Sequence, residues 1–369
     1  MKTLLKWAGG KEREWKFIKP RLPQTIKNYY EPFLGGGAVF FNIENIKGNC
    51  YLNDISVELI SFYNIIKNND RYFAKAIENI NNNWLNIDKI YKKKEEKIIQ
   101  KYIHFKNNEL SEKESLVFIK KVAKSVAQSL IKQSKNQTIL YDEFVKSLKN
   151  KFRRTKKLEK DKGSLPSKDI SDIFLSSLKS GFYTYVRELY NKPDTYDISR
   201  SKLSAYFLFM RMFCYSGMFR YNKNGEFNVP YGGMGYNQNN LAKKIKYYKS
   251  PELNNKLSNS NFYNKDFETF LTKHSPSKND FIFLDPPYDT EFSTYAKNVF
   301  DRDDHKRLAK YLISETKAKW LLVIKSTDFI LNLYDNDSLI LEKIDKKYNV
   351  SFMDRNVRDV THLIIRNYS

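Results

Sequence analysis

Four consecutive residues, Asp285, Pro286, Pro287 and Tyr288, follow the apolar stretch 281–284 and carry groups that could bind a planar ring. The apolar stretch predicts a strand that brings them to the edge of a sheet. The two prolines fix φ and donate no backbone N–H, so the turn is rigid and its carbonyls can accept hydrogen bonds. A carboxylate, a rigid carbonyl and an aromatic face suit an amino-bearing ring such as adenine. The alternative is an ordinary strand-to-turn exit, in which Asp-Pro is common.

A glycine-containing loop opens the chain at residues 4–11, Leu-Leu-Lys-Trp-Ala-Gly-Gly-Lys. Glycine lets the backbone approach a ligand closely, which is the functional interpretation of this loop. The loop is too short for a Walker P-loop, so binding of a nucleoside triphosphate is disfavoured. A plain turn near the N-terminus is the alternative.

A second glycine-rich turn, at residues 35–37, lies between a predicted strand and a helix predicted over 38–46, an arrangement that begins many nucleotide-binding α/β folds. The next predicted strand, 50–53, ends at Asp54, which is 17 residues after Gly37. This is close to the spacing at which an acid binds ribose hydroxyls. Phe40 stands where the dinucleotide fingerprint has its last glycine. An adenosine-containing ligand without a pyrophosphate therefore fits better than NAD.

These motifs belong to an α/β pattern with a long interruption. After a helix predicted over 57–67, the alternation stops until a strand at 261–266, which ends in Asp266. A helix over 303–316 and strands at 319–325, 339–344 and 361–366 would complete the sheet. The pattern predicts an α/β fold with a large insert.

The insert is rich in lysine and predicted to be mostly helical. Ser111 and Glu114 form a capping-box pattern that opens a helix through about residue 133, and a further helix is predicted over 141–154, followed by a loop over 156–167. For the charged runs we favour a solvated helical face over DNA contact. Residues 217–232 contain Asn224-Gly225, which predicts a hairpin. This hairpin could probe base edges or could brace the insert.

Composition narrows the class of protein. The net charge of +23 in 369 residues fits a polyanionic partner, although a bias toward lysine and asparagine would produce it as well. The two cysteines and four histidines show no metal-ligand spacing, so we expect no metal. No apolar run is long enough to span a membrane, and we expect a soluble, cytoplasmic protein without a membrane partner.

Taken in order, the motifs resemble those of the Dam-type (D12, or alpha-class) DNA adenine-N6 methyltransferases. The resemblance rests on Lys-Trp-Ala-Gly-Gly-Lys, Glu-Pro-Phe-x-Gly-x-Gly, Asn-Asp, the hairpin Gly-Glu-Phe-Asn-Val-Pro-Tyr-Gly, Asp-Pro-Pro-Tyr and the C-terminal Arg-Asn-Tyr. It covers roughly residues 1–80 and 181–369. Each motif is short, but their succession in this order is highly specific.

The resemblance implies a Rossmann-like fold with a mixed, mainly parallel sheet, and S-adenosylmethionine as the cofactor. Residues 1–68 and 258–369 would form the catalytic domain. Residues 69–257 would form a DNA target-recognition domain, with a family-atypical helical insert at about 84–180. The implied cofactor-binding residues are Trp7, Ala8, Gly9, Lys11, Glu31, Phe33, Gly35, Gly37, Asp54, Asp266 and Asp285.

The resemblance also implies methyl transfer to N6 of an adenine flipped out of double-stranded DNA. Asp285 and the Pro286 carbonyl would accept hydrogen bonds from N6, and Tyr288 would stack on the base. Asp54 would bind the ribose hydroxyls of the cofactor, and Asp266 its adenine amino group. The implied DNA-binding residues are Lys6, Met218, Arg220, Asn228 and Pro230.

Several alternatives stay open at this point. Related motifs occur in RNA methyltransferases, and a non-catalytic DNA-binding descendant of the fold is a further possibility. The recognition sequence is open, because GATC-specific members carry Arg-Tyr-like residues where this chain has Gly233-Met234. A restriction–modification system with a separately acting endonuclease and a solitary or phage-borne role are equally compatible with these residues.

Overall fold

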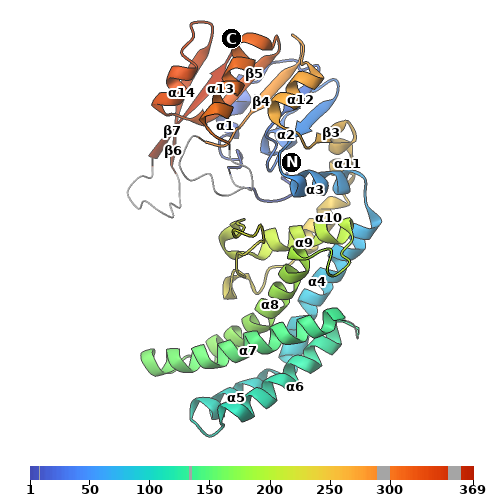
Figure 1. Cartoon of the computed structure of the whole chain (residues 1–369), viewed down its shortest axis with the longest axis vertical. Helices are drawn as coiled ribbons and strands as arrows, with labels where there is room; N and C mark the ends of the chain where they lie inside the picture. The colour runs from blue at the N-terminus through green and yellow to red at the C-terminus, as the bar shows by residue number, and fades with distance from the viewer. Residues whose placement is uncertain (8, 133–134, 289–299, 348–358) are drawn as a thin grey trace. The chain divides into compact units, whose positions relative to one another are not determined.

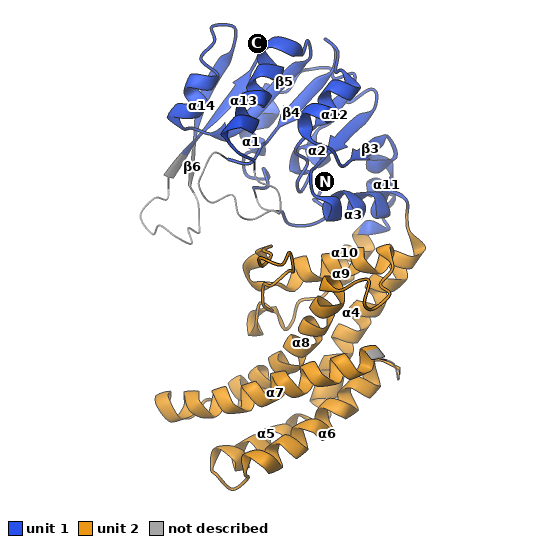
Figure 2. Cartoon of the chain, viewed as in Figure 1, with its two compact units in different colours: residues 1–68, 248–369 blue, residues 69–247 orange. Residues whose placement is uncertain are grey.

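The computed structural model describes residues 1–7, 9–132, 135–288, 300–347 and 359–369 (Figure 1). The chain divides into two compact units (Figure 2). Unit 1 comprises residues 1–68 and 248–369, and unit 2 comprises residues 69–247. Among the helices in the described ranges, none is both long enough and apolar enough to cross a membrane.

The second boundary lies ten residues earlier than the sequence predicted. Helix α11 (Pro251–Ser258) belongs to unit 1, where its Leu253 and Leu257 are buried. Its Lys256 Nζ donates a hydrogen bond to the Ile43 carbonyl at 2.6 Å. Just before the helix, the Tyr248 hydroxyl donates to the Leu4 carbonyl at 2.7 Å. Helix α11 therefore packs within unit 1.

Unit 1 contains a seven-stranded sheet in the order β3-β2-β1-β4-β5-β7-β6. The first five strands in this order are parallel, whereas β7 is antiparallel to both β5 and β6. The prediction of a mixed, mainly parallel sheet is confirmed. The strands are β1 (Tyr29–Glu31), β2 (Cys50–Asn53), β3 (Ser260–Tyr263), β4 (Phe281–Leu284), β5 (Lys319–Lys325), β6 (Ile340–Lys347) and β7 (Asp359–Arg366).

The central strands β1 and β4 are buried along their whole length, as expected of strands covered on both faces. On one face, side chains of β1, β4, β5 and β7 form a core with helices α12 (Phe267–His274), α13 (Arg302–Lys310) and α14 (Asp328–Leu333). The π-helical turn Tyr311–Glu315 continues α13. The other helical segments of unit 1 are α1 (Trp15–Ile18), the 3-10 turn Lys19–Arg21, α2 (Ala38–Asn42) and α3 (Val57–Lys67).

Unit 2 is mostly helical. Its helices are α4 (Arg71–Lys92), α5 (Glu95–Lys106), α6 (Glu112–Leu130), α7 (Lys135–Lys162), α8 (Ser167–Asn191), α9 (Arg200–Phe213) and α10 (Ala242–Tyr248), whose last residue lies in unit 1. The capping box predicted at Ser111 and Glu114 is present and opens α6. Between α9 and α10, short 3-10 turns and isolated antiparallel bridges replace regular structure.

Helix α7 extends through Lys162, so the loop predicted over 156–167 is wrong for its first seven residues. The buried stripe of the helix continues with Thr155 and Glu159. Glu159 accepts hydrogen bonds from the Tyr102 hydroxyl, from Lys106 Nζ at 3.3 Å and from the Leu165 amide at 2.9 Å. Because a buried carboxylate is tolerated when it is hydrogen-bonded, this charged stretch remains helical.

Candidate active site

Carboxylates follow four neighbouring strands of the sheet. Glu31 ends β1, Asp54 follows β2, Asp266 lies three residues after β3, and Asp285 follows β4. Parallel strands bring their carboxyl ends to one edge, so the four side chains lie along the same edge. The chain first builds outward from β1 to β2 and β3, and then returns to place β4 on the other side of β1. Ligands of open α/β sheets bind at such a switch point, here between the ends of β1 and β4.

Lys11 lies directly against the Asp-Pro-Pro-Tyr turn. Its Nζ is 2.5 Å from Asp285 Oδ1, and it donates hydrogen bonds to the Tyr288 hydroxyl and the Gly9 carbonyl, each at 3.0 Å. The Lys11 side chain is 2% exposed, and that of Asp285 is 18% exposed. Pro286 is buried. Lys11 was predicted to bind the cofactor, and the structure brings its ammonium group to the predicted catalytic turn.

The Tyr288 hydroxyl has a second partner that was not predicted from the sequence. His362 Nε2, on β7, lies 3.1 Å from it, and the two rings meet edge to face with centroids 5.4 Å apart. His362 is completely buried. The signal that could have found it is a histidine inside the apolar run 360–365, where the other buried positions are aliphatic.

The glycine-rich turn after β1 is held by Asp54. Its Oδ2 accepts a hydrogen bond from the Gly35 amide at 2.8 Å, and its Oδ1 accepts one from the Ser56 amide at 2.9 Å. Burial raises the pKa of Asp54, against the effect of these two hydrogen bonds. Gly37 has φ +69°, and a Cβ there would lie 2.9 Å from the Tyr63 hydroxyl. This turn therefore requires glycine for both its conformation and its packing.

The N-terminal loop packs on the same turn. A Cβ on Gly35 would lie 3.0 Å from the Trp7 ring, and one on Gly36 would lie 3.2 Å from Trp7 Cβ. Gly9 has φ +77° and is exposed. Ala8, which was predicted to bind the cofactor, lies outside the described residues. The two glycine loops, distant in sequence, thus form one wall of the candidate site.

Glu31 is the most deeply placed of the four carboxylates, with 2% exposure. The Tyr29 hydroxyl donates a hydrogen bond to its Oε2 at 2.8 Å. Burial raises the pKa of Glu31 well above its usual range, and the negative charge of Asp285 adds to this effect, although the hydrogen bond from Tyr29 opposes it. A cation bound at this edge would favour the charged form of Glu31.

Asp266 caps α12 and contacts a residue that was not predicted from the sequence. Its Oδ1 accepts hydrogen bonds from the amides of Glu268 and Thr269, at 3.0 and 3.3 Å. Its Oδ2 accepts one from Arg307 on α13 at 3.0 Å. Burial would raise the pKa of Asp266, but the hydrogen bonds from Arg307 and the two amides lower it overall. Nearby, Phe33 packs against the rings of Phe267 and Phe300, with centroids 5.5 and 5.4 Å apart.

The predicted DNA-binding residues divide between the two units. Lys6 is exposed in unit 1. In unit 2, the exposed Arg220 donates from Nε to Asn228 Oδ1 at 3.3 Å, and the Asn228 amide donates to the Arg220 carbonyl at 3.2 Å. Met218 is partly buried and Pro230 is exposed. The segment is a hairpin-like turn with two isolated bridges, Tyr221 to Phe227 and Cys214 to Tyr231, where a regular hairpin was predicted.

Comparison with known proteins identifies the family. The model of the D12 class N6 adenine-specific DNA methyltransferases matches residues 7–162 and 156–350. The chain belongs to this family. The resemblance drawn from the motifs is therefore confirmed.

Individual relatives match this chain over nearly all of its length. A Type II methyltransferase, M.CviBI, of Paramecium bursaria Chlorella virus NC1A is 29% identical over the whole of both chains. M.MjaIII, a Type II methyltransferase of Methanocaldococcus jannaschii, is 28% identical over 100% of this chain and 99% of its own. The DNA N-6-adenine-methyltransferase of Escherichia phage P1 is 26% identical over 99% of this chain and 35% of its own.

A polar network anchors the segment after the hairpin of this D12 methyltransferase. Lys179 of α8 is fully buried and contacts Asp88 of α4 at 2.9 Å and the Asn237 carbonyl at 2.5 Å. Its Nζ also lies 4.5 Å from the centroid of the Trp84 ring. The Tyr231 hydroxyl donates to Asn237 Oδ1 at 3.0 Å. The helices of the insert thereby fix the segment in which GATC-specific members carry Arg-Tyr-like residues.

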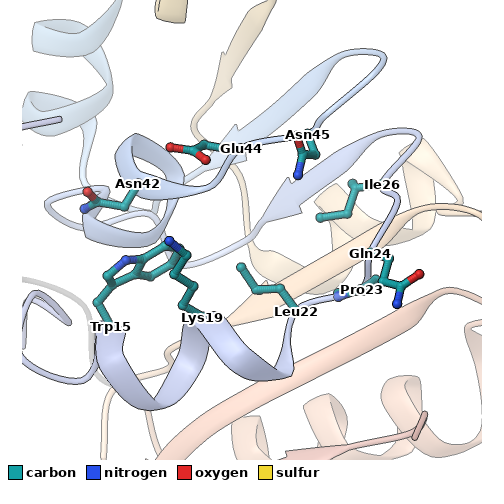
Figure 3. Close-up of a pocket in the computed structure, with 9 residues that line it drawn as sticks. All are labelled: Trp15, Lys19, Leu22, Pro23, Gln24, Ile26, Asn42, Glu44 and Asn45. Carbon is teal, nitrogen blue, oxygen red and sulfur yellow. The ribbon is translucent and has the colours of Figure 1, made fainter.

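One hollow of about 200 Å³ in unit 1 lies away from these residues (Figure 3). It is lined by the end of α2 and the chain that precedes β1, which lie at the opposite edge of the sheet from Asp285. Its lining residues are Trp15, Lys19, Leu22, Pro23, Gln24, Ile26, Asn42, Glu44 and Asn45. Within the described ranges, no three His, Cys, Asp or Glu side chains are grouped as a metal site.

Proposed function

We propose that this chain transfers the methyl group of S-adenosylmethionine to N6 of an adenine within a short sequence of double-stranded DNA. One observation carries the proposal: at the switch point of the sheet, the Asp285 carboxylate already accepts an N–H donor, Lys11 Nζ, beside the ring of Tyr288. A carboxylate in this position can accept the N–H of an amino group in the same way.

The residues at the edge of the sheet fit the cofactor. When bound, S-adenosylmethionine supplies an electrophilic methyl group on a positively charged sulfur. Asp54 would bind ribose hydroxyls with its free lone pairs, and Asp266 would bind the adenine amino group. The glycine turn at Gly35 and Gly37 permits close approach of the backbone. Glu31 and Asp285 add negative charge near the cation, and Trp7 and Phe33 add aromatic surface.

The chemistry follows from the electronic structure of the target. The lone pair of the adenine N6 is delocalised into the ring, so the free amino group is a poor nucleophile. Hydrogen bonds to Asp285 and to the Pro286 carbonyl would draw its two N–H groups out of the ring plane and localise the lone pair on nitrogen. The N6–CH3 bond would form as the bond between sulfur and the methyl group breaks, which leaves a neutral thioether. The nitrogen must then lose one proton, and the Asp285 carboxylate would accept it. Tyr288 would stack on the base.

Charge supports a DNA-binding role for unit 2. This unit holds 36 of the 65 lysine and arginine residues but only 18 of the 42 acidic ones, so it carries +18 of the total charge of +23. Phosphate contacts by such a surface supply most of the affinity for duplex DNA. We assign DNA recognition to unit 2 and methyl transfer to unit 1. Although the charged runs of the helical segment 84–180 taken alone favoured a solvated face, the net charge of the whole unit leads us to propose that this segment adds phosphate contacts to the recognition domain, and that the protein acts in the cytoplasm.

The biological setting is narrowed by the names of the relatives. The two Type II methyltransferases favour a restriction–modification system, in which a separately acting endonuclease cleaves the unmethylated sequence. The phage P1 relative favours a phage-borne methylase. The two settings differ in whether an endonuclease accompanies the enzyme. The methyl-transfer chemistry is the same in both.

The test is single-molecule sequencing of DNA from an unmethylated host that expresses the chain. We expect N6-methyladenine within one short motif, and none when the host expresses Asp285→Ala, although this variant should still bind S-adenosylmethionine in calorimetry. A wild-type chain that leaves DNA unmodified would refute the proposal. Methylated RNA in the same host would then point to an RNA methyltransferase.

A further inference from the structure

The hydroxyl group of Tyr288 is bonded from two sides by residues far apart in the chain. Lys11 Nζ lies 3.0 Å from it and His362 Nε2 lies 3.1 Å from it. Lys11 comes from the N-terminal loop and His362 from β7, whereas Tyr288 itself follows the two prolines after β4. The tyrosine is therefore fixed at its backbone end by a rigid turn and at its hydroxyl end by two hydrogen bonds.

The donor and acceptor inventory fixes the direction of one of these two bonds. The Lys11 ammonium can only donate, so the Tyr288 oxygen accepts from it. The bond between the Tyr288 hydroxyl and His362 Nε2 can form in either tautomer of the imidazole: Nε2 accepts from the hydroxyl when the proton is on Nδ1, and it donates to the tyrosine oxygen when the proton is on Nε2. In both tautomers the Tyr288 hydroxyl is held between Lys11 and His362.

His362 sits in a rigid part of the sheet. It pairs with Lys325 of β5 on one side and with Ile344 of β6 on the other. Its side chain is completely buried, and Leu363, Ile364 and Ile365 follow it in the strand. An imidazole at such a position costs stability relative to an aliphatic side chain unless it is hydrogen-bonded. A purely structural requirement would be met better by leucine.

We propose that His362 is a positioning residue for methyl transfer, which it serves by holding the Tyr288 ring in the orientation that stacks on the target adenine. The proposal rests on the proposed function. The imidazole meets the tyrosine ring at an interplanar angle of 68°, and Lys11 Nζ lies 5.3 Å from the centroid of the same ring, so both groups set the orientation of the ring. Because the tyrosine ring is already fixed, it loses little rotational freedom when the base binds. More of the favourable stacking energy is then available to hold the base with its N6 against Asp285.

The experiment compares two substitutions of His362 in single-turnover methyl transfer. His362→Leu removes the hydrogen-bond partner of the Tyr288 hydroxyl and should lower the rate of methyl transfer about 3- to 10-fold, as expected for one lost hydrogen bond, with unchanged affinity for S-adenosylmethionine. His362→Gln can still form a hydrogen bond with the tyrosine, as donor or acceptor, and should retain the wild-type rate within about twofold. DNA with 2-aminopurine at the target position should report weaker stacking in His362→Leu alone.

A double-mutant cycle separates positioning from packing. In the Tyr288→Phe background, which lacks the hydroxyl, His362→Leu should cause no further loss. Ile365→Val, in the same strand but nearer the other edge of the sheet, controls for a lowered core stability and should leave the rate unchanged. The inference fails if folded His362→Leu transfers methyl groups at the wild-type rate, or if its effect persists without the hydroxyl. A wild-type chain without methyl transfer would instead refute the proposed function.

Discussion

Asp285→Ala should destabilise unit 1 as well as abolish methyl transfer, although removal of a catalytic residue usually costs no stability. The substitution leaves the buried ammonium group of Lys11 with hydrogen bonds but without its counter-charge. Breaking a buried ion pair costs about 3–5 kcal/mol. Because the Asp285 side chain is 18% exposed, solvent partly screens the ion pair, and we expect a smaller cost of about 2–3 kcal/mol. For a unit of about 190 residues this corresponds to a Tm about 4–12 °C lower.

Calorimetric unfolding of the full chain at neutral pH measures this effect. Lys11→Met with Asp285→Ala removes both charges and should recover part of the loss, since no buried charge is then left unpaired. Asp303→Asn is the matched control, because it removes one partner of an exposed ion pair with Lys306 and should leave the Tm unchanged. The reasoning is wrong if Asp285→Ala unfolds at the wild-type temperature or above it, or if the double variant is less stable than Asp285→Ala.

Three further substitutions test the site and the insert. Gly37→Ala should lower the free energy of unfolding by about 1–3 kcal/mol and weaken S-adenosylmethionine binding in calorimetry, whereas Gly163→Ala, with φ +88° and open space around it, should leave binding unchanged. Lys179→Met should cost about 2–4 kcal/mol in urea unfolding and relax the methylated sequence, and the exposed Lys168→Met should do neither. Glu31 binds its proton more tightly in the folded state, so stability should fall as the pH rises from about 4.3 through the raised pKa. Glu31→Gln should remove that slope, and an unchanged slope would contradict the assignment.

The sequence predicted what depends on short-range patterns. An apolar run followed by an acid marked the ends of β2 and β4, at Asp54 and Asp285, and glycine clusters marked the turns beside them. Each signal lies within a few residues of the feature that it predicts. The long interruption between two α/β segments likewise indicated the insert. The order of the motifs then identified the family, which the family comparison confirmed.

Features that depend on distant contacts were predicted less well. The end of α7 was predicted at its charged stretch, because lysine, arginine and glutamate at high density resemble a loop. The helix continues because Glu159 finds a hydroxyl donor 57 positions away, on Tyr102. The boundary between the two units differs from the predicted domain boundary for a similar reason, since the contact that ties Lys256 to unit 1 joins it to Ile43, 213 positions earlier.

The same reasoning explains which residues of the candidate site were missed. Tyr288 is 277 positions from Lys11 and 74 from His362, so no local pattern joins the three. His362 lies beside the carboxyl ends of the parallel strands because β7 is inserted, antiparallel, between β5 and β6. The sign in the sequence was a departure from a pattern: one histidine in a run that is otherwise suited to a buried strand. Because function often opposes local preference at such departures, a polar residue within an apolar strand is the signal by which His362 can be recognised from the sequence alone.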